Sequence, residues 1–135
     1  MKFQTSKKVR IQHCDPAGVV FTPQYFNLFI EVVEDWFCDA LGYSYASMIS
    51  RDASGTPAMK ITAKFHKTSI LGDTLDFSLS VMQLRSKSAL LSIKASCNKE
   101  KRCQMEFLYG FAKLNAKGLQ AWPVDLAEKM SKYLV

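Results

Sequence analysis

Residues 24–41 restrict the fold most, because they are typical of one helix that is apolar around most of its circumference. A helix of this kind has to be buried on nearly every side. Its polar residues keep to a narrow stripe. The apolar positions are Phe26, Leu28, Phe29, Ile30, Val32, Val33, Trp36, Phe37 and Ala40, and the stripe is Gln24, Asn27, Glu31, Glu34, Asp35 and Cys38. We therefore expect the rest of the chain to wrap around this helix.

The loop in front of the helix holds one carboxylate, Asp15, among turn-forming residues. Thr22 and Pro23 predict where the helix starts. A threonine can cap the first turn, and a proline at the first helical position gives up no hydrogen bond. Gly42 can end the helix in the left-handed conformation. This pattern predicts an active-site loop that leads into a buried helix.

The remaining chain alternates between apolar and polar residues, which is typical of strands with one buried face. Short polar turns separate these segments, so neighbouring strands should be antiparallel. A run of strands after a helix indicates the α+β class. We expect residues 1–135 to form a single domain in which one sheet curls around the helix. The strands are expected at 3–12, 58–70, 75–84, 89–97 and 103–115, a short helix or turn at 44–50, and a C-terminal helix at 123–134.

Composition narrows the function classes. The net charge of +6 allows anionic partners, but the basic clusters are too short to indicate a nucleic-acid tail. No apolar run is long enough to span a bilayer. The start of the chain lacks the layout of a signal peptide, so we expect a cytoplasmic protein. The four cysteines lack both close pairs and metal-ligand spacing, which favours free thiols.

The stretch His13-Cys14-Asp15-Pro16-Ala17-Gly18-Val19-Val20-Phe21-Thr22-Pro23-Gln24-Tyr25-Phe26 resembles the signature loop of the hotdog-fold acyl-CoA thioesterases of the 4-hydroxybenzoyl-CoA thioesterase type. The resemblance continues through residues 55–57 and 70–73 to residues 84–88. It implies a hotdog fold, an antiparallel five-stranded sheet wrapped around one long central helix. It also implies hydrolysis of an aryl- or short acyl-CoA to free acid and CoA, with no metal and no cofactor beyond the CoA of the substrate. Members of this family are homodimers or homotetramers (dimers of dimers) with sites at subunit interfaces.

Asp15 is the expected catalytic group, because it is the only carboxylate in the loop. It could attack the thioester carbonyl or act as general base on water. The alternative is that Asp15 only caps a turn before Pro16. The backbone N–H of Thr22, at the helix start, is the expected oxyanion donor. Gly18 would let the substrate approach the backbone closely.

A second group of residues is expected to bind the substrate. Arg85 and Lys87 match the basic nucleotide-contacting segment of the family and are assigned to the phosphates of CoA, with Ser86 or Ser88 as further donors. The alternative is an ordinary solvated turn. Phe21 and Tyr25, with Phe26, could line the acyl pocket, although aromatic residues at a helix start are more often part of the core.

Rival interpretations remain for other polar residues. His13 could move protons with Asp15, but a locally hydrogen-bonded histidine is the plainer interpretation. Cys14 lacks an evident base. Glu31, Glu34 and Asp35 lie on the helix, where a second thioesterase lineage carries its catalytic acid; a structural role is favoured for them here. The alternative function is a hotdog protein that binds acyl-CoA or acyl-carrier protein without hydrolysis.

Overall fold

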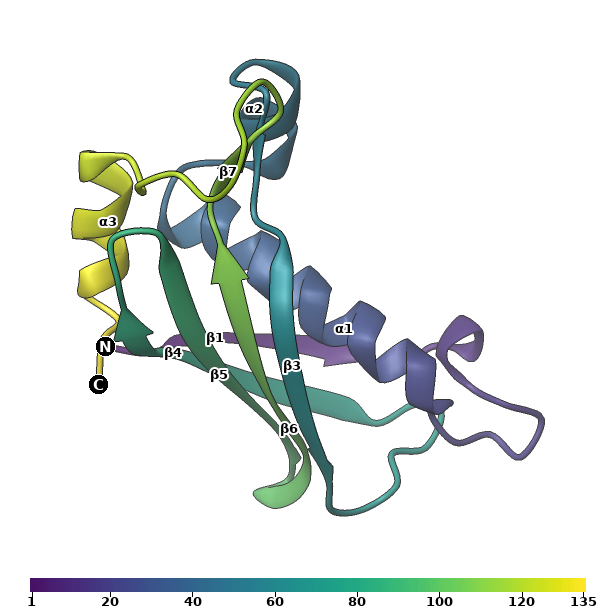
Figure 1. Ribbon diagram of the computed structural model, residues 1–135. Helices are drawn as coiled ribbons and strands as arrows, with labels where there is room; N and C mark the ends of the chain where they lie inside the picture. Colours follow the sequence, from purple (N-terminus) through teal and green to yellow (C-terminus); the bar gives the residue numbers. More distant parts are fainter.

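The computed structural model describes residues 1–135 and shows a five-stranded antiparallel sheet with a long helix lying across one face (Figure 1). This confirms the predicted α+β class and the hotdog arrangement. The strand order is β1-β4-β5-β6-β3, so the strand that follows the helix region lies at one edge of the sheet. The sheet strands are β1 (Phe3–Lys8), β3 (Ala58–Phe65), β4 (Thr74–Leu84), β5 (Ser88–Cys97) and β6 (Glu100–Gly110).

The central helix begins earlier and ends differently from the prediction. Helix α1 spans Thr22–Asp35 and continues into a π-helical turn, Trp36–Ala40, in which the Leu41 N–H donates to the Trp36 carbonyl. Its buried side chains pack on the inner faces of β4, β5 and β6 in one core cluster. Phe29, for example, meets Phe77 edge to face, with ring centroids 5.2 Å apart. The prediction of a helix buried on nearly every side is confirmed for the face that meets the sheet, but Ile30 is 43% exposed, and the irregular last turn differs from the prediction.

The shorter elements partly follow the predictions. Helix α2 (Tyr45–Ser50) is capped by the Ser44 side chain, and α3 (Val124–Ser131) packs beside the far end of the sheet. Between the expected helix 44–50 and the expected strand 58–70, the structure adds a short strand, β2 (Ser54–Gly55), which pairs with β7 (Ala112–Lys113). Strand β1 stops at Lys8, and residues 11–13 form a 3₁₀ turn, so the expected strand 3–12 is too long.

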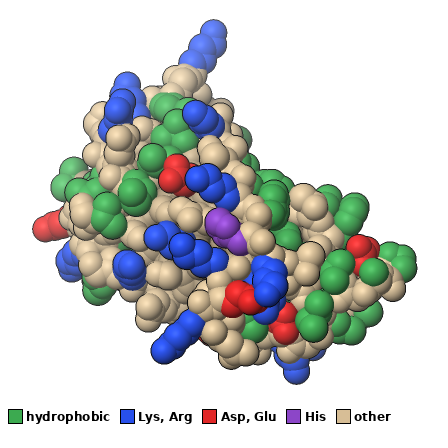
Figure 2. All heavy atoms as spheres, turned by 90° about the horizontal axis from the view of Figure 1, so that it is seen from below, with side chains coloured by type: hydrophobic (Ala, Val, Ile, Leu, Met, Phe, Trp, Pro, Cys, Tyr) green, Lys and Arg blue, Asp and Glu red, His purple; other side chains and the backbone are tan.

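The two faces of the sheet differ in polarity because side chains alternate along each strand. Inward-facing residues such as Leu79, Ile93 and Met105 are fully buried under α1. Outward-facing positions are mostly polar. Figure 2, which views the molecule from below, shows Lys and Arg side chains gathered near the middle of that face.

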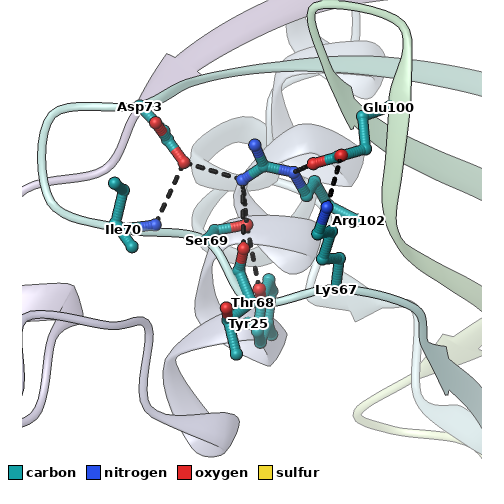
Figure 3. Close-up of polar contacts among 8 residues, drawn as sticks. All are labelled: Tyr25, Lys67, Thr68, Ser69, Ile70, Asp73, Glu100 and Arg102. Atoms are coloured by element: carbon teal, nitrogen blue, oxygen red, sulfur yellow. Dashed lines mark hydrogen bonds and ion pairs between the residues drawn. The ribbon is translucent and has the colours of Figure 1, made fainter.

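The segment between β3 and β4, residues 66–73, is held by one arginine of β6 (Figure 3). The Arg102 guanidinium donates to the carboxylates of Asp73 at 2.7 Å and Glu100 at 2.8 Å. It also donates to the Thr68 carbonyl at 3.2 Å and to the Ser69 hydroxyl at 3.3 Å. The side chain of Arg102 is only 12% exposed. These contacts hold the pKa of Asp73 below its usual value, chiefly because Arg102 donates to its carboxylate.

This network also reaches the central helix. The Tyr25 hydroxyl of α1 donates to the Ser69 hydroxyl at 3.0 Å, and both residues are buried. The Ser69 carbonyl accepts from the Val20 N–H at 2.8 Å, while the Leu71 N–H donates to the Gly18 carbonyl at 2.9 Å. Arg102 therefore fixes the 66–73 segment, and that segment fixes the loop in front of α1.

We expect the Arg102→Leu substitution to lower the free energy of unfolding by roughly 2–3 kcal/mol, because it removes charge-assisted hydrogen bonds and leaves the Asp73 carboxylate without its cation, with only the Ile70 N–H donating to it. The measurement is chemical denaturation at neutral pH. Lys101→Leu, at the exposed neighbouring position, is the control and should change stability by less than about 0.5 kcal/mol. Equal effects of the two substitutions would contradict a special role for Arg102.

The same contact predicts a dependence on pH. The pKa of Asp73 is lowered in the folded protein, so its contribution to stability is present above the unfolded pKa and is lost as the pH falls through the folded value. The stability difference between the wild type and Asp73→Asn should therefore shrink on acidification. A difference that stays constant down to strongly acidic pH would show that the carboxylate charge is not involved.

Candidate active site

The loop in front of α1 folds back on itself like a small hairpin. The Phe21 N–H donates to the His13 carbonyl, and the Asp15 N–H donates to the Val19 carbonyl, both at 2.9 Å. Gly18 closes the tip with φ +78°, a left-handed conformation that favours glycine. A Cβ added at Gly18 would meet no atom within 4 Å, so the space beside this residue is open. This is the place that the sequence assigned to substrate approach.

The Asp15 carboxylate is held by the loop through one of its oxygens. Oδ1 accepts hydrogen bonds from the Ala17 N–H at 2.9 Å and, more weakly, from the Val19 N–H at 3.4 Å. Oδ2 has no hydrogen-bond partner within the chain. The turn cap that the sequence offered as the alternative is therefore present, but it occupies only half of the carboxylate.

The start of α1 corrects one prediction. Thr22 does not cap the helix, because it is itself the first helical residue and Pro23 is the second. Phe21 occupies the cap position in an extended conformation and offers no side-chain hydrogen bond. Since Pro23 has no N–H and the Gln24 N–H already donates to the Phe21 carbonyl, Thr22 is left with the unpaired N–H of this turn.

A cavity of about 290 Å³ adjoins this helix start. Thr22 and Tyr25 line it from α1, and Phe65 and His66 line it from the end of β3. Tyr25 is a core residue whose hydroxyl is held by Ser69, and burial raises the pKa of this phenol. The ring of Phe65 lies 5.6 Å from that of Tyr25 and half of the residue remains exposed. Phe21, 53% exposed, is not among the residues that line this cavity.

The rival residues of the loop have local partners. The Nδ1 atom of His13 accepts a hydrogen bond from the Arg10 N–H at 2.9 Å, and burial lowers the pKa of the imidazole. The Cys14 thiol donates to the Arg10 carbonyl at 3.5 Å. The locally bonded histidine that the sequence favoured is confirmed. All four cysteines of the chain are free.

Two of the three helix acids are held by one lysine of β1. Lys7 contacts the carboxylates of Glu31 and Asp35, each at 2.6 Å. Burial opposes the charge on Lys7, but hydrogen bonds to Asp35 and Glu31 outweigh it and raise the pKa of the ammonium group. These contacts support the structural role that the sequence favoured for Glu31 and Asp35. Glu34 takes part in no ion pair.

The predicted phosphate-binding residues lie at the other end of the sheet. Arg85 and Ser88 line a shared cavity of about 280 Å³ on the outer face, whereas Lys87 is not among its lining residues. The hairpin is closed by a hydrogen bond from the Arg85 N–H to the Ser88 carbonyl at 2.8 Å. Lys60 of β3 lines the same cavity. Strand β4 alone, 11 residues long, separates this end from the Asp15 end by roughly 35 Å.

Sequence reasoning missed three residues, namely Ser69 and Phe65 near the loop and Lys60 in the cavity with Arg85. Phe65 and Lys60 belong to a recognised alternating strand, but alternation does not say that this strand lies at the sheet edge. Ser69 was placed inside an expected strand, 58–70, which in fact ends at Phe65.

No group of three His, Cys, Asp or Glu side chains is close enough to hold a metal ion. No helix is long and apolar enough to cross a membrane.

Solved structures of CoA thioesterases share this architecture at low sequence identity. A 1,4-dihydroxy-2-naphthoyl-CoA thioesterase from Synechocystis aligns with TM-score 0.88 and 18% identity, covering 97% of this chain and 96% of its own. A 4-hydroxybenzoyl-CoA thioesterase variant with one aspartate changed to asparagine, in complex with 4-hydroxybenzoyl-CoA, aligns with TM-score 0.84 and 20% identity over 96% and 98% of the two chains. A Staphylococcus aureus protein in complex with CoA aligns with TM-score 0.89 and 15% identity over 98% and 84%.

The similarity to these structures establishes the shared fold. No curated protein matches the chain significantly in sequence. A family model, that of the Thioesterase-like superfamily, matches residues 9–130, which include the candidate loop, the whole sheet from β3 onward and most of α3. The chain belongs to the Thioesterase-like superfamily.

Proposed function

We propose that this protein hydrolyses an aryl- or short acyl-CoA thioester, similar to 4-hydroxybenzoyl-CoA, to the free acid and CoA. One observation carries the proposal. The loop in front of α1 holds a carboxylate with one free oxygen, that of Asp15, and it leads directly to Thr22, whose backbone N–H at the start of the helix is unpaired. A thioester needs these two things, a nucleophile or activated water and a donor for the oxyanion.

In this mechanism Asp15 supplies the reacting oxygen. In the first route Oδ2 attacks the thioester carbonyl, which releases the CoA thiolate and gives a mixed anhydride; water then hydrolyses the anhydride, which frees the acid and restores the Asp15 carboxylate. In the second route Oδ2 takes a proton from the water that attacks the carbonyl. The Ala17 N–H keeps Oδ1 in place in both cases, so the carboxylate meets the substrate already oriented. The Thr22 N–H donates to the carbonyl oxygen as negative charge develops there. Neither route requires a metal or a further cofactor. We also propose a cytoplasmic location.

The edge strand β3 supports a dimeric enzyme. β3 pairs with β6 on one side only, and its inward-facing side chains Ile61 and Phe65 are 40% and 50% exposed. An unpaired edge strand with exposed apolar side chains on its inner face is normally covered. Antiparallel pairing of β3 with β3 of a second copy would cover it. We propose this homodimer as the unit of function, with a homotetramer as a pair of such dimers.

This pairing also explains why the two predicted sites lie far apart in one chain. Two antiparallel β3 strands bring the Lys60 end of one sheet towards the Phe65 end of the other. The thioester of a bound acyl-CoA would then lie at Asp15 of one protomer. Its phosphates would meet Arg85, Ser88 and Lys60 of the partner subunit, with Lys87 at the rim. Phe65 and Tyr25 would line the acyl pocket, with Phe21 at its mouth.

Asp15→Asn tests the catalytic carboxylate. The amide keeps the size of the side chain and its carbonyl oxygen can still accept from the Ala17 N–H, but it neither attacks nor takes a proton. We expect CoA release from benzoyl-type and short acyl-CoA substrates to fall by at least about 100-fold at unchanged stability. Unchanged turnover in a folded Asp15→Asn protein would refute the assignment. Tight CoA-ester binding by the wild type without CoA release would favour the alternative, a non-hydrolytic binder.

Thr22→Pro tests the oxyanion donor. Proline removes the backbone N–H, and it suits the first helical position because Phe21 before it is already extended. We expect kcat to fall by about 10²–10³-fold, the usual cost of losing one oxyanion donor. Thr22→Ala, which keeps the N–H, is the matched control and should stay within a few-fold of wild type. Equal activities of the two variants would assign the donor elsewhere.

Ile61→Glu tests the dimer. A carboxylate on each copy of the paired edge strand should prevent association, because like charges would meet in an apolar contact. We expect a dimer for wild type and a monomer with little thioesterase activity for the variant, measured by light scattering and CoA release. Lys117→Glu, on an exposed turn, is the control and should remain dimeric. A monomeric but fully active wild type would contradict the shared site.

A further inference from the structure

The outer face of the sheet carries a cavity that the proposed thioester chemistry does not use. It lies where β5 ends and β6 begins, on the face away from α1, and has a volume of about 570 Å³. That volume is within the range of small-molecule sites. The cavity with Arg85 and Ser88 lies at the opposite end of the strands and shares no lining residue with it.

The strand register places two rows of polar side chains side by side on the floor of this cavity. Beneath them the alternate residues Phe77, Ala95 and Cys103 are buried in the core. The short serine side chains leave room between the longer ones. The rows are Gln4, Ser78, Lys94 and Gln104, and Ser6, Asp76, Ser96 and Lys101.

The charges around the cavity are mostly positive. Lys94 and Lys101 belong to the two rows, and Lys2 and His66 also line the cavity. None of the three lysines takes part in an ion pair. The one carboxylate, Asp76, accepts a hydrogen bond from the Ser6 hydroxyl at 2.8 Å. Lys and Arg side chains, with a histidine among them, gather on the face shown in Figure 2. Three ammonium groups around one cavity repel one another, and a bound anion would relieve that repulsion.

The lining also excludes some ligand classes. It offers no exposed aromatic ring and no apolar side chain for an acyl group, because its hydrophobic members face the core. It offers hydroxyl, amide and ammonium donors, which suit the oxygens of phosphate groups. We propose that this cavity binds a small molecule with two or more phosphate groups, of the class of pyrophosphate or a nucleoside bisphosphate. This cavity shares His66 with the cavity at the helix start but contains none of the residues assigned to the thioester chemistry, and the proposal does not rest on the function proposed above.

The test is a titration of the full chain with pyrophosphate and with adenosine 3′,5′-bisphosphate, followed through backbone amide shifts by NMR. We expect saturable shifts at Ser78, Ser96 and Gln104. The double variant Lys94→Gln/Lys101→Gln should bind about tenfold more weakly, since two charge contacts are lost. Lys117→Gln/Lys132→Gln removes the same charge from exposed positions elsewhere and should bind as wild type does. Tighter binding of the bisphosphate than of pyrophosphate would identify a nucleotide as the ligand; equal binding would identify the phosphates alone.

Several outcomes would overturn the proposal. These are no saturable shift at millimolar probe, equal weakening in both double variants, or shifts that appear at Ser88 and Lys60 instead. Binding of a single-stranded oligonucleotide with steep salt dependence, but of neither small probe, would make the face a nucleic-acid surface. Because the readout is a chemical shift and not turnover, a failure of the Asp15 mechanism would leave this test unaffected.

Discussion

The position of the candidate loop depends on one mostly buried guanidinium, that of Arg102. A buried charge is stable only when its hydrogen-bonding groups are satisfied. Here two carboxylates, a carbonyl and a hydroxyl satisfy it, and all except Glu100 come from residues 68–73. That segment in turn accepts from Val20 and donates to Gly18. The place of Asp15 is thus set by a residue on a strand near the far end of the sequence.

The sheet does not bury α1 completely, and β3 also leaves apolar side chains exposed. The inner faces of β4, β5 and β6 cover most of the helix, but Ile30 on α1 is 43% exposed and the inner face of β3 is open as well. The edge strand β3 is thus one place where exposed apolar side chains gather, and its Phe65 also lines the cavity at the helix start. A second copy would cover the edge strand and this surface together, which is why we regard the dimer and the complete site as one proposal.

The sequence predicted the elements well where periodicity is strong, as in α1 and the strands β4 and β5. Prediction from the sequence failed where contacts between distant parts of the chain determine the helix cap or the bounds of a strand. The cap of α1 is Phe21, which makes no side-chain hydrogen bond that a sequence pattern could reveal. Arg102 lies just outside the expected strand 103–115, yet it belongs to β6 and its side chain is mostly buried. Its partners become visible only once the strand order places β6 beside β3, because alternation gives no strand order. The roles of Asp15, Gly18 and Thr22 stay predictions.

The two interpretations of Asp15 turn out to be compatible, because a carboxylate has two oxygens. The backbone of the loop holds Oδ1, and this contact is the turn cap that any Asp-Pro-Ala-Gly sequence can form. The same contact limits rotation of the side chain and thereby fixes the direction of Oδ2. A freely rotating aspartate would lose conformational entropy on reaching the thioester, whereas this one has lost it already on folding. The structural contact is thus what makes a loop aspartate a suitable reactive group.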